Sequence, residues 1–213
     1  MCIRDSYVIC STVKSNVLYE SVLDRERDWI FEDVSKCFEA LALVESDCEA
    51  QADQYRKDLE YQIAYRTFRT GEPVSAYQEN LLEMHGWRYR SAVRPRSVLL
   101  MDDCSHSLLF SKSQKNPLTN LVLRSRHVGD GCGLSIAMIA QTYTSGIPRA
   151  LRQNLTHMAV FYTASDREVK SMYEELGGLV SFDRFKELFV AYTLSKHSYL
   201  WCDLIERQLR DSF

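Results

Sequence analysis

Three polar side chains stand directly after apolar runs of the sequence. Asp102 and Asp103 follow the run 98–101, and Gln141 follows the run 134–140. Both runs are almost wholly apolar, which is typical of strands covered on both faces of a parallel sheet. Ligands of such sheets bind at the carboxyl ends of the strands, so the spacing predicts a ligand site there. On this stretch alone, a solvated turn explains Asp102 and Asp103 equally well, because Asp is a common turn residue.

A strand that ends in two acids, then a helix, then an apolar strand that ends in an amide resembles the second half of a P-loop ATPase core. The resemblance implies an α/β fold, the three-layer and mostly parallel sheet of the RecA/ASCE-like P-loop NTPases. It implies ATP and Mg²⁺ as cofactors, with Asp102 holding the Mg²⁺. Asp103 would then take the proton from the attacking water. Gln141 would sense the γ-phosphate and orient that water.

The stretch 124–154, RSRHVGDGCGLSIAMIAQTYTSGIPRALRQN, narrows the resemblance. An Arg126–His127 pair precedes the second strand, and Pro148, Arg152 and Asn154 follow Gln141. This order resembles the FtsK–HerA superfamily of DNA-pumping ATPases, most closely the poxvirus and giant-virus type of DNA-packaging ATPase, over about residues 97–160. The resemblance implies that Arg152 is an arginine finger for a neighbouring subunit, with Arg149 as second choice. Solvated helix arginines remain the alternative for both.

The resemblance also implies a function and partners. These are ATP-driven packaging of a viral genome into a capsid by a homo-oligomeric ring, which binds double-stranded DNA and capsid or portal proteins. The expected place is the host cytoplasm, in a viral factory, or the virion. A cellular or conjugative DNA translocase is the alternative within the superfamily. A non-catalytic module that binds a partner through its helices is the alternative outside it.

One motif of this class is missing, because no G-x-x-x-x-G-K-[ST] phosphate loop occurs in the sequence. GDGCG at 129–133 lies before a strand, which is the wrong order for a phosphate cradle. We therefore expect a partial ATPase domain at 7–213, truncated so that its first central strand and phosphate loop are lost, behind a non-native leader at 1–6. The fragment would be inactive alone, and strands near 135–140 and 158–161 would have unpaired edges or close on each other.

Alternating patterns predict the elements that position these residues. The predicted strands are 7–11, 97–101, 134–140, 158–163 and 198–204, and alternation with helices predicts parallel βαβ units. A region without Pro or Gly at 29–68 predicts a long amphipathic helix or helical pair, within a helical insertion at about 28–86. Further helices are predicted at 77–85, 116–129, 147–154, 165–178 and 181–194. Their expected caps are Asn116, Ser165 with Glu168 as a capping box, and Ser181.

Composition sets outer limits on function. The 213 residues are 46% hydrophobic and 26% charged with a net charge of -3, so any nucleic-acid contact must come from a local patch. No apolar run approaches the roughly 20 residues that span a membrane. Seven widely spread cysteines without a C-x-x-C pair favour buried thiols in a reducing compartment.

A basic aromatic segment is the predicted DNA contact. Its arginines alternate with Trp87 and Tyr89, which suits sequence-independent contact with a phosphate backbone, and two lysines after the acidic strand could face a DNA channel. An ordinary charged surface is the alternative. Cations such as Arg126 and His127 also suit a helix C-terminus, and His106 fits an exposed loop as well as a place near the metal. The DNA-binding candidates are Arg88, Arg90, Arg94, Arg96, Lys112 and Lys115.

Overall fold

The computed structural model describes residues 5–15, 17–24, 28–105, 107–111, 116–176 and 180–211. His106, Lys112 and Lys115 lie outside the described residues. The chain forms two compact units, which are described separately. The first consists of Met1–Asp102 and Leu123–Ile139, and the second of Asp103–Val122 and Ala140–Phe213.

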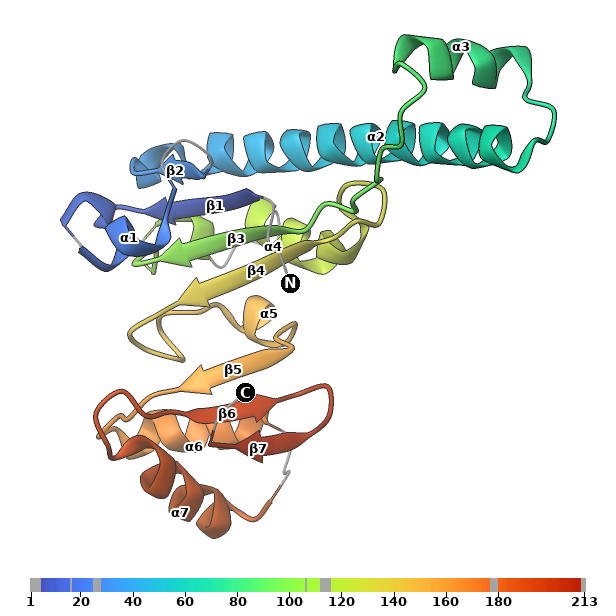
Figure 1. Ribbon diagram of the computed structural model, residues 1–213. Helices are drawn as coiled ribbons and strands as arrows, with labels where there is room; N and C mark the ends of the chain where they lie inside the picture. Colours follow the sequence, from blue (N-terminus) through green and yellow to red (C-terminus); the bar gives the residue numbers. More distant parts are fainter. Residues whose placement is uncertain are drawn as a thin grey trace. The chain divides into compact units, whose positions relative to one another are not determined.

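A four-stranded parallel sheet is the centre of the first unit (Figure 1). Its strand order is β2-β1-β3-β4, and the predictions of β1, β3 and β4 are confirmed. The strand β1 begins within the expected leader, since Asp5 and Ser6 pair with Ser97 and Val98. The bounds are Asp5–Cys10 for β1, Trp29–Phe31 for β2, Ser97–Asp102 for β3 and Leu134–Ile139 for β4.

Helices cover both faces of this sheet, which gives three layers. Successive strand residues point to opposite faces. Val8 packs with Tyr19 of α1 (Val17–Val22), which follows the short η1 helix Val13–Ser15. Tyr7 on the other face donates its hydroxyl to Asp47 of α2 (Cys37–Thr70) and accepts a hydrogen bond from Gln51. The sheet is therefore sandwiched between α1 and α2.

The helix α2 begins later than predicted. Residues 29–31 form β2 and Val34–Lys36 form the η2 helix, so the helical region expected from residue 29 begins with a strand. The aromatic and β-branched residues of this short run favour a strand, and β1 offers it a free edge. The left-handed Gly71 ends α2, and α3 (Ala76–Met84) packs along its second half, past the sheet (Figure 1).

The second unit is built around a smaller sheet with two helices. Its apolar core joins β5 and β6 to α6 and α7, and the predicted caps Ser165 and Ser181 accept backbone hydrogen bonds. Asn116, directly before α4, likewise accepts from the amide of Leu118. The bounds in this unit are η3 Leu108–Phe110, α5 Arg149–Arg152, β5 His157–Val160, α6 Asp166–Glu175, α7 Phe182–Thr193, β6 Leu200–Asp203 and β7 Gln208–Arg210. The helix α4 (Pro117–Arg124) begins in this unit, and the η4 helix Ser125–His127 after it belongs to the first.

The prediction of parallel βαβ units is wrong for this second sheet. Strands β5 and β6 pair antiparallel, as do β6 and β7. Two consecutive helices, rather than one, connect β5 to β6, so the chain returns to the sheet from the opposite end. Asp203 then accepts hydrogen bonds from the amides of Ile205 and Glu206, which forms the turn into β7.

Two edge strands of the described sheets match the first of the two expected outcomes, unpaired edges, and do not pair with each other. Among the described strands, β4 ends the parallel sheet and β5 ends the antiparallel one, each with a single partner strand. Each therefore offers a row of backbone groups along its other side. In the described ranges, no helix has the length and apolar character needed to cross a membrane.

Candidate functional site

Asp102 ends β3 on the face that α1 covers. Residues 98, 100 and 102 share one face, and Tyr19 and Leu100 pack there against the same apolar cluster around Val8. The Tyr19 hydroxyl donates to Oδ2 of Asp102 at 2.5 Å. Burial, together with the Asp102 carboxylate, raises the pKa of Tyr19 well above its ordinary value. In this conformation the predicted Mg²⁺ ligand is therefore engaged by a tyrosine.

Asp103 adopts an unusual backbone conformation directly after the strand. Its φ of 54° lies in the left-handed region, which costs a residue with a side chain about 1–2 kcal/mol. The side chain is exposed, and it has no hydrogen-bond or ion-pair partner among the described residues. The turn therefore presents a carboxylate to solvent at the end of β3.

The strand β4 ends at the same edge of the sheet as β3. The parallel register pairs Asp102 with Ile139, and Gln141 follows two residues later with an exposed side chain. The sheet thus brings the two predicted strand ends together. This part of the sequence prediction rests on register alone.

Arg152 of α5 is held inside the second unit. Its guanidinium binds Glu175 through two hydrogen bonds, of 2.8 Å from Nε and 2.7 Å from Nη2. Nη1 donates to the carbonyl oxygens of Ile147 and Thr144, and the guanidinium lies 4.9 Å from the centre of the Tyr143 ring. Only 8% of the side chain is exposed. Here Arg152 anchors residues 142–147, which we name the post-β4 loop.

Glu168 of α6 holds the same loop from the other side. Its carboxylate accepts hydrogen bonds from the amides of Tyr143, at 2.7 Å, and Thr144, and from the Thr144 hydroxyl. Burial raises the pKa of Glu168, but these hydrogen bonds outweigh burial and hold the pKa below its ordinary value. The capping box predicted for Glu168 is only half formed: Ser165 accepts from the Glu168 amide, while the carboxylate turns to the loop.

A second carboxylate of α6 completes this clamp. Glu175 lies seven residues after Glu168, on the same side of the helix, and accepts from the Tyr143 hydroxyl at 2.9 Å. The hydrogen bonds from Arg152 are the main reason why the pKa of Glu175 is lowered. Burial and the Glu175 carboxylate raise the pKa of Tyr143.

The post-β4 loop is also tight. A Cβ atom on Gly146 would stand 2.3 Å from the carbonyl oxygen of Thr142, so only glycine fits there. The hydroxyls of Thr142 and Ser145 lie 2.7 Å apart. The loop that follows Gln141 is therefore fixed by its own packing and by α5 and α6.

The second arginine candidate, Arg149, lies one helical turn before Arg152. Its side chain is exposed, whereas Arg152 must release Glu175 before it can reach outward. Of the two, Arg149 is better placed for contact with another molecule. The assignment of an arginine finger stays a prediction for both.

The predicted magnesium ligand fits the chemistry of that ion. Mg²⁺ is held by one or two carboxylates together with phosphate oxygens and waters, not by a cage of protein ligands alone. Asp102 supplies one such carboxylate, and no group of three or more His, Cys, Asp or Glu side chains that could hold a metal occurs among the described residues. The strand end therefore suits a metal that a nucleotide would help to bind.

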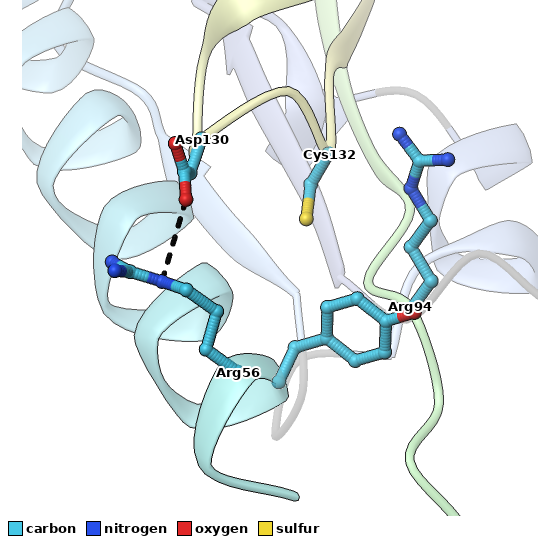
Figure 2. Close-up of a pocket in the computed structure, with 5 residues that line it drawn as sticks. Arg56, Arg94, Asp130 and Cys132 are labelled. Atoms are coloured by element: carbon cyan, nitrogen blue, oxygen red, sulfur yellow. Dashed lines mark ion pairs between the residues drawn. The ribbon is translucent and has the colours of Figure 1, made fainter. Parts of the chain in front are cut away.

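The basic segment contacts the second half of α2 through its residues 85–89 and then leads to β3. Arg88, Arg90, Arg94 and Arg96 are all exposed, as are Arg126 and His127 at the end of η4. Arg94 donates to the carbonyl oxygen of Gly131. A small cavity of about 160 Å³ lies there. In Figure 2, Cys132 lies between the Arg56–Asp130 ion pair and Arg94.

Three residues of these networks, Tyr19, Tyr143 and Glu175, had no role in the sequence prediction, and Glu168 was predicted only as a helix cap. No sequence pattern indicates a role for Tyr19. It reaches Asp102 only because α1 packs on the face of the sheet from which the Asp102 side chain projects. The spacing of Glu168 and Glu175 was a usable signal, since seven residues place two acids on one side of a helix. Tyr143 follows Gln141 closely and joins both acids.

Comparison with solved structures assigns the fold. The genome packaging NTPase B204 from Sulfolobus turreted icosahedral virus 2, in complex with ATP-γS, matches with a TM-score of 0.51 and 12% identity, over 97% of this chain and 81% of that chain. EssC (ATPases 2 and 3) from Geobacillus thermodenitrificans matches with a TM-score of 0.41 and 15% identity, over 80% and 28% of the two chains. The pCW3 conjugation coupling protein TcpA matches with a TM-score of 0.38 and 12% identity, over 79% and 42%.

Comparisons of the sequence alone found no match. No protein-family profile and no curated protein matches the sequence. The B204 similarity and the parallel sheet between helices carry the assignment. This chain has the fold of the P-loop NTPases.

Proposed function

We propose that this chain is the larger part of an ATP-driven DNA translocase of the genome-packaging type. The observation that carries the proposal is the edge where β3 and β4 end together. Asp102 and Asp103 stand at one strand end and Gln141 follows the other, on a fold shared with a packaging NTPase. Ligands of parallel α/β sheets bind at this kind of edge.

Each residue at this edge has one proposed task. Asp102 holds Mg²⁺, which neutralises charge on the nucleotide phosphates when it is bound. Asp103 accepts the proton of the attacking water, and its exposed carboxylate can reach solvent for that purpose. Gln141 orients the water. The post-β4 loop, clamped by Arg152, Glu168 and Glu175, keeps the backbone after Gln141 in place.

The proposal requires a phosphate loop that this sequence does not contain. We place that loop, with the strand before it, in sequence outside these 213 residues. The open sides of β4 and β5 support this placement, because each could pair with one further strand. The proposal also includes a homo-oligomeric ring, capsid or portal partners, and action in the host cytoplasm or virion.

The genomic sequence upstream of the Tyr7 codon is the first test. We expect an in-frame apolar strand followed by G-x-x-x-x-G-K-[ST]. A start codon there without such a loop would contradict the proposal. The non-catalytic partner-binding module would then be favoured, and the engagement of Asp102 by Tyr19 would be read as a permanent contact.

The second test measures ATP turnover. The 213-residue chain alone should not hydrolyse ATP, and the chain joined to its upstream segment should. Asp103→Asn should abolish turnover in the joined protein, because the amide cannot accept the proton. Asp183→Asn, at an exposed acid of α7, is the matched control and should have no effect. Equal turnover in Asp103→Asn and its parent would remove the base from the proposal.

A third test distinguishes a genome-packaging motor from a general DNA translocase. A packaging motor should depend on capsid or portal protein for DNA movement. A cellular or conjugative translocase should move free DNA without them. Movement of free duplex by the joined protein, unaffected by portal protein, would favour the latter.

A further inference from the structure

The segment that leads from α3 to β3 concentrates positive charge. We name residues 85–96 the strap. It contains Arg88, Arg90, Arg94 and Arg96, and no Asp or Glu occurs between Met84 and Met101. The whole chain has a net charge of -3, so this is a local excess of cations.

Three ring contacts fix the strap to α2. The rings of Tyr61 and His85 lie 5.1 Å apart, those of Tyr65 and Tyr89 5.8 Å, and those of Phe68 and Trp87 4.8 Å. All three pairs meet edge to face, a favoured arrangement of aromatic rings. The positions on α2 are spaced by four and three residues, so the rings form one row along the helix. Each aromatic side chain of the strap is thus oriented by one ring contact with α2, while Trp87 and Tyr89 stay partly exposed.

Backbone contacts hold the strap as well. Tyr61 is 1% exposed, and its hydroxyl donates to the carbonyl oxygen of Arg88. Gln62 donates to the Tyr89 hydroxyl at 3.0 Å. Trp87 follows Gly86 in the left-handed region, with a φ of 55°, which persists only where surrounding contacts enforce it. The strap is therefore a positioned segment although it is neither helix nor strand.

The four guanidinium groups remain available to a partner. All four residues are exposed, and none forms an ion pair with a carboxylate among the described residues. Arg90 contacts His85, and Arg94 contacts a carbonyl oxygen. By contrast, Arg56, Arg124 and Arg184 are each paired with an acid. The strap thus keeps its charge unneutralised.

We propose that the strap binds the sugar–phosphate backbone of duplex DNA. Guanidinium groups bind phosphate oxygens through paired hydrogen bonds, and a row of them suits a row of phosphates. We take duplex as the partner because the proposed function moves duplex DNA. Trp87 and Tyr89 are 37% and 57% exposed, so stacking on the bases of a single strand is the competing mode that the test separates. The choice of DNA as partner rests on the proposed function; the location on the strap between α3 and β3 goes beyond it (Figure 1).

The test measures affinity of the chain itself for a labelled duplex at several salt concentrations, without nucleotide. Each phosphate neutralised contributes about -0.9 to the slope of log K against log salt, so Arg88→Gln/Arg90→Gln should make the slope shallower by about 2. Arg167→Gln/Lys170→Gln on α6 removes the same charge from exposed positions elsewhere and is the matched control. It should leave the slope unchanged.

Several outcomes would overturn the proposal. They are no binding of the parent to duplex, an unchanged slope in the strap variant, or an equal change in the control. Tighter binding of single strands that Trp87→Ala abolishes would replace duplex contact with base stacking. Because the assay uses neither ATP nor the upstream segment, its result is independent of whether the joined protein hydrolyses ATP.

Discussion

The end of β3 and the post-β4 loop are built on opposite principles. In the loop, backbone amides, carbonyl oxygens and side chains are bonded to α5 and α6 through Arg152, Glu168 and Glu175. At the end of β3, Asp102 is held by a tyrosine, and Asp103 faces solvent in a left-handed conformation. The loop contributes to the stability of its unit, whereas Asp103 at the strand end costs stability.

This difference indicates where a ligand is needed. A network that is complete by itself gains little from a further partner. Backbone strain and unpaired exposed charge do not help a protein to fold. They are found most often at active sites and ligand-binding sites, where function requires them. The contrast therefore assigns the post-β4 loop a positioning task and the strand end a chemical one.

The largest expected effect tests the loop. Arg152→Ala leaves Glu175 without its cation and two carbonyl oxygens without a donor. Removing one partner of a largely buried ion pair costs about 3 kcal/mol of unfolding free energy. Arg149→Ala, at an exposed position of the same helix, should cost no more than about 0.5 kcal/mol. Urea unfolding of the two variants measures the difference, and equal losses would show that the clamp adds no stability.

The next effect is a dependence of stability on pH. The folded state lowers the pKa of both Glu168 and Glu175 below the ordinary 4.5. The ionised clamp therefore stabilises the fold fully above that pH, and the contribution is lost as pH falls through the lowered values. Below about pH 4.5 the urea midpoint of the parent should fall more steeply than that of Glu168→Gln/Glu175→Gln.

The control for this effect is Glu174→Gln, which alters an acid of α6 that is 61% exposed. It should retain the steep acid dependence of the parent. If the double variant also retained it, the acid dependence would belong to other groups. The ionised Glu168 and Glu175 carboxylates would then add no measurable stability to the post-β4 loop.

A smaller effect tests the contact at the strand end. Tyr19→Phe removes the hydroxyl that binds Asp102 and should cost about 1 kcal/mol of unfolding free energy. It should also make the Asp102 carboxylate more accessible to a divalent cation. Unfolding with and without Mg²⁺ measures both, and the variant should gain more from Mg²⁺ than the parent. An equal gain would show that Tyr19 does not compete with the metal.

The sequence predicted strands where apolar runs were long. The runs that became β1, β3 and β4 were recognisable, and their parallel register followed from alternation with helices. The three-residue strands β2 and β7 were missed, because a run that short has no measurable period. The antiparallel second sheet was missed because adjacent helices, α6 and α7, were not recognised as reversing the direction of the chain.

The sequence could predict which residue types stand at the strand ends of the candidate site, but not which side chains they contact. Asp102 and Gln141 could be placed at strand ends because each ends an apolar run. The roles of Arg152 and Glu168 could not, since their partners lie 23 and about 25 residues away in sequence and meet only after folding. A capping pattern correctly placed the start of α6, but it could not show that the Glu168 carboxylate binds the post-β4 loop instead.

The smallest expected change in stability tests whether the end of β3 is kept for chemistry, unlike the post-β4 loop. Asp103→Gly relieves the left-handed strain, offset in part by the greater flexibility of glycine in the unfolded chain, so the unfolding free energy should rise by about 0.5 kcal/mol. In the joined protein the same change should abolish ATP turnover. A loss of stability in urea unfolding would mean that Asp103 makes a contact the fold needs. A gain in stability with a loss of turnover would show that the chain keeps a strained acid at this position for chemistry. Gly146 of the post-β4 loop is the opposite case, because a side chain there would collide with the carbonyl oxygen of Thr142 and the fold itself requires glycine.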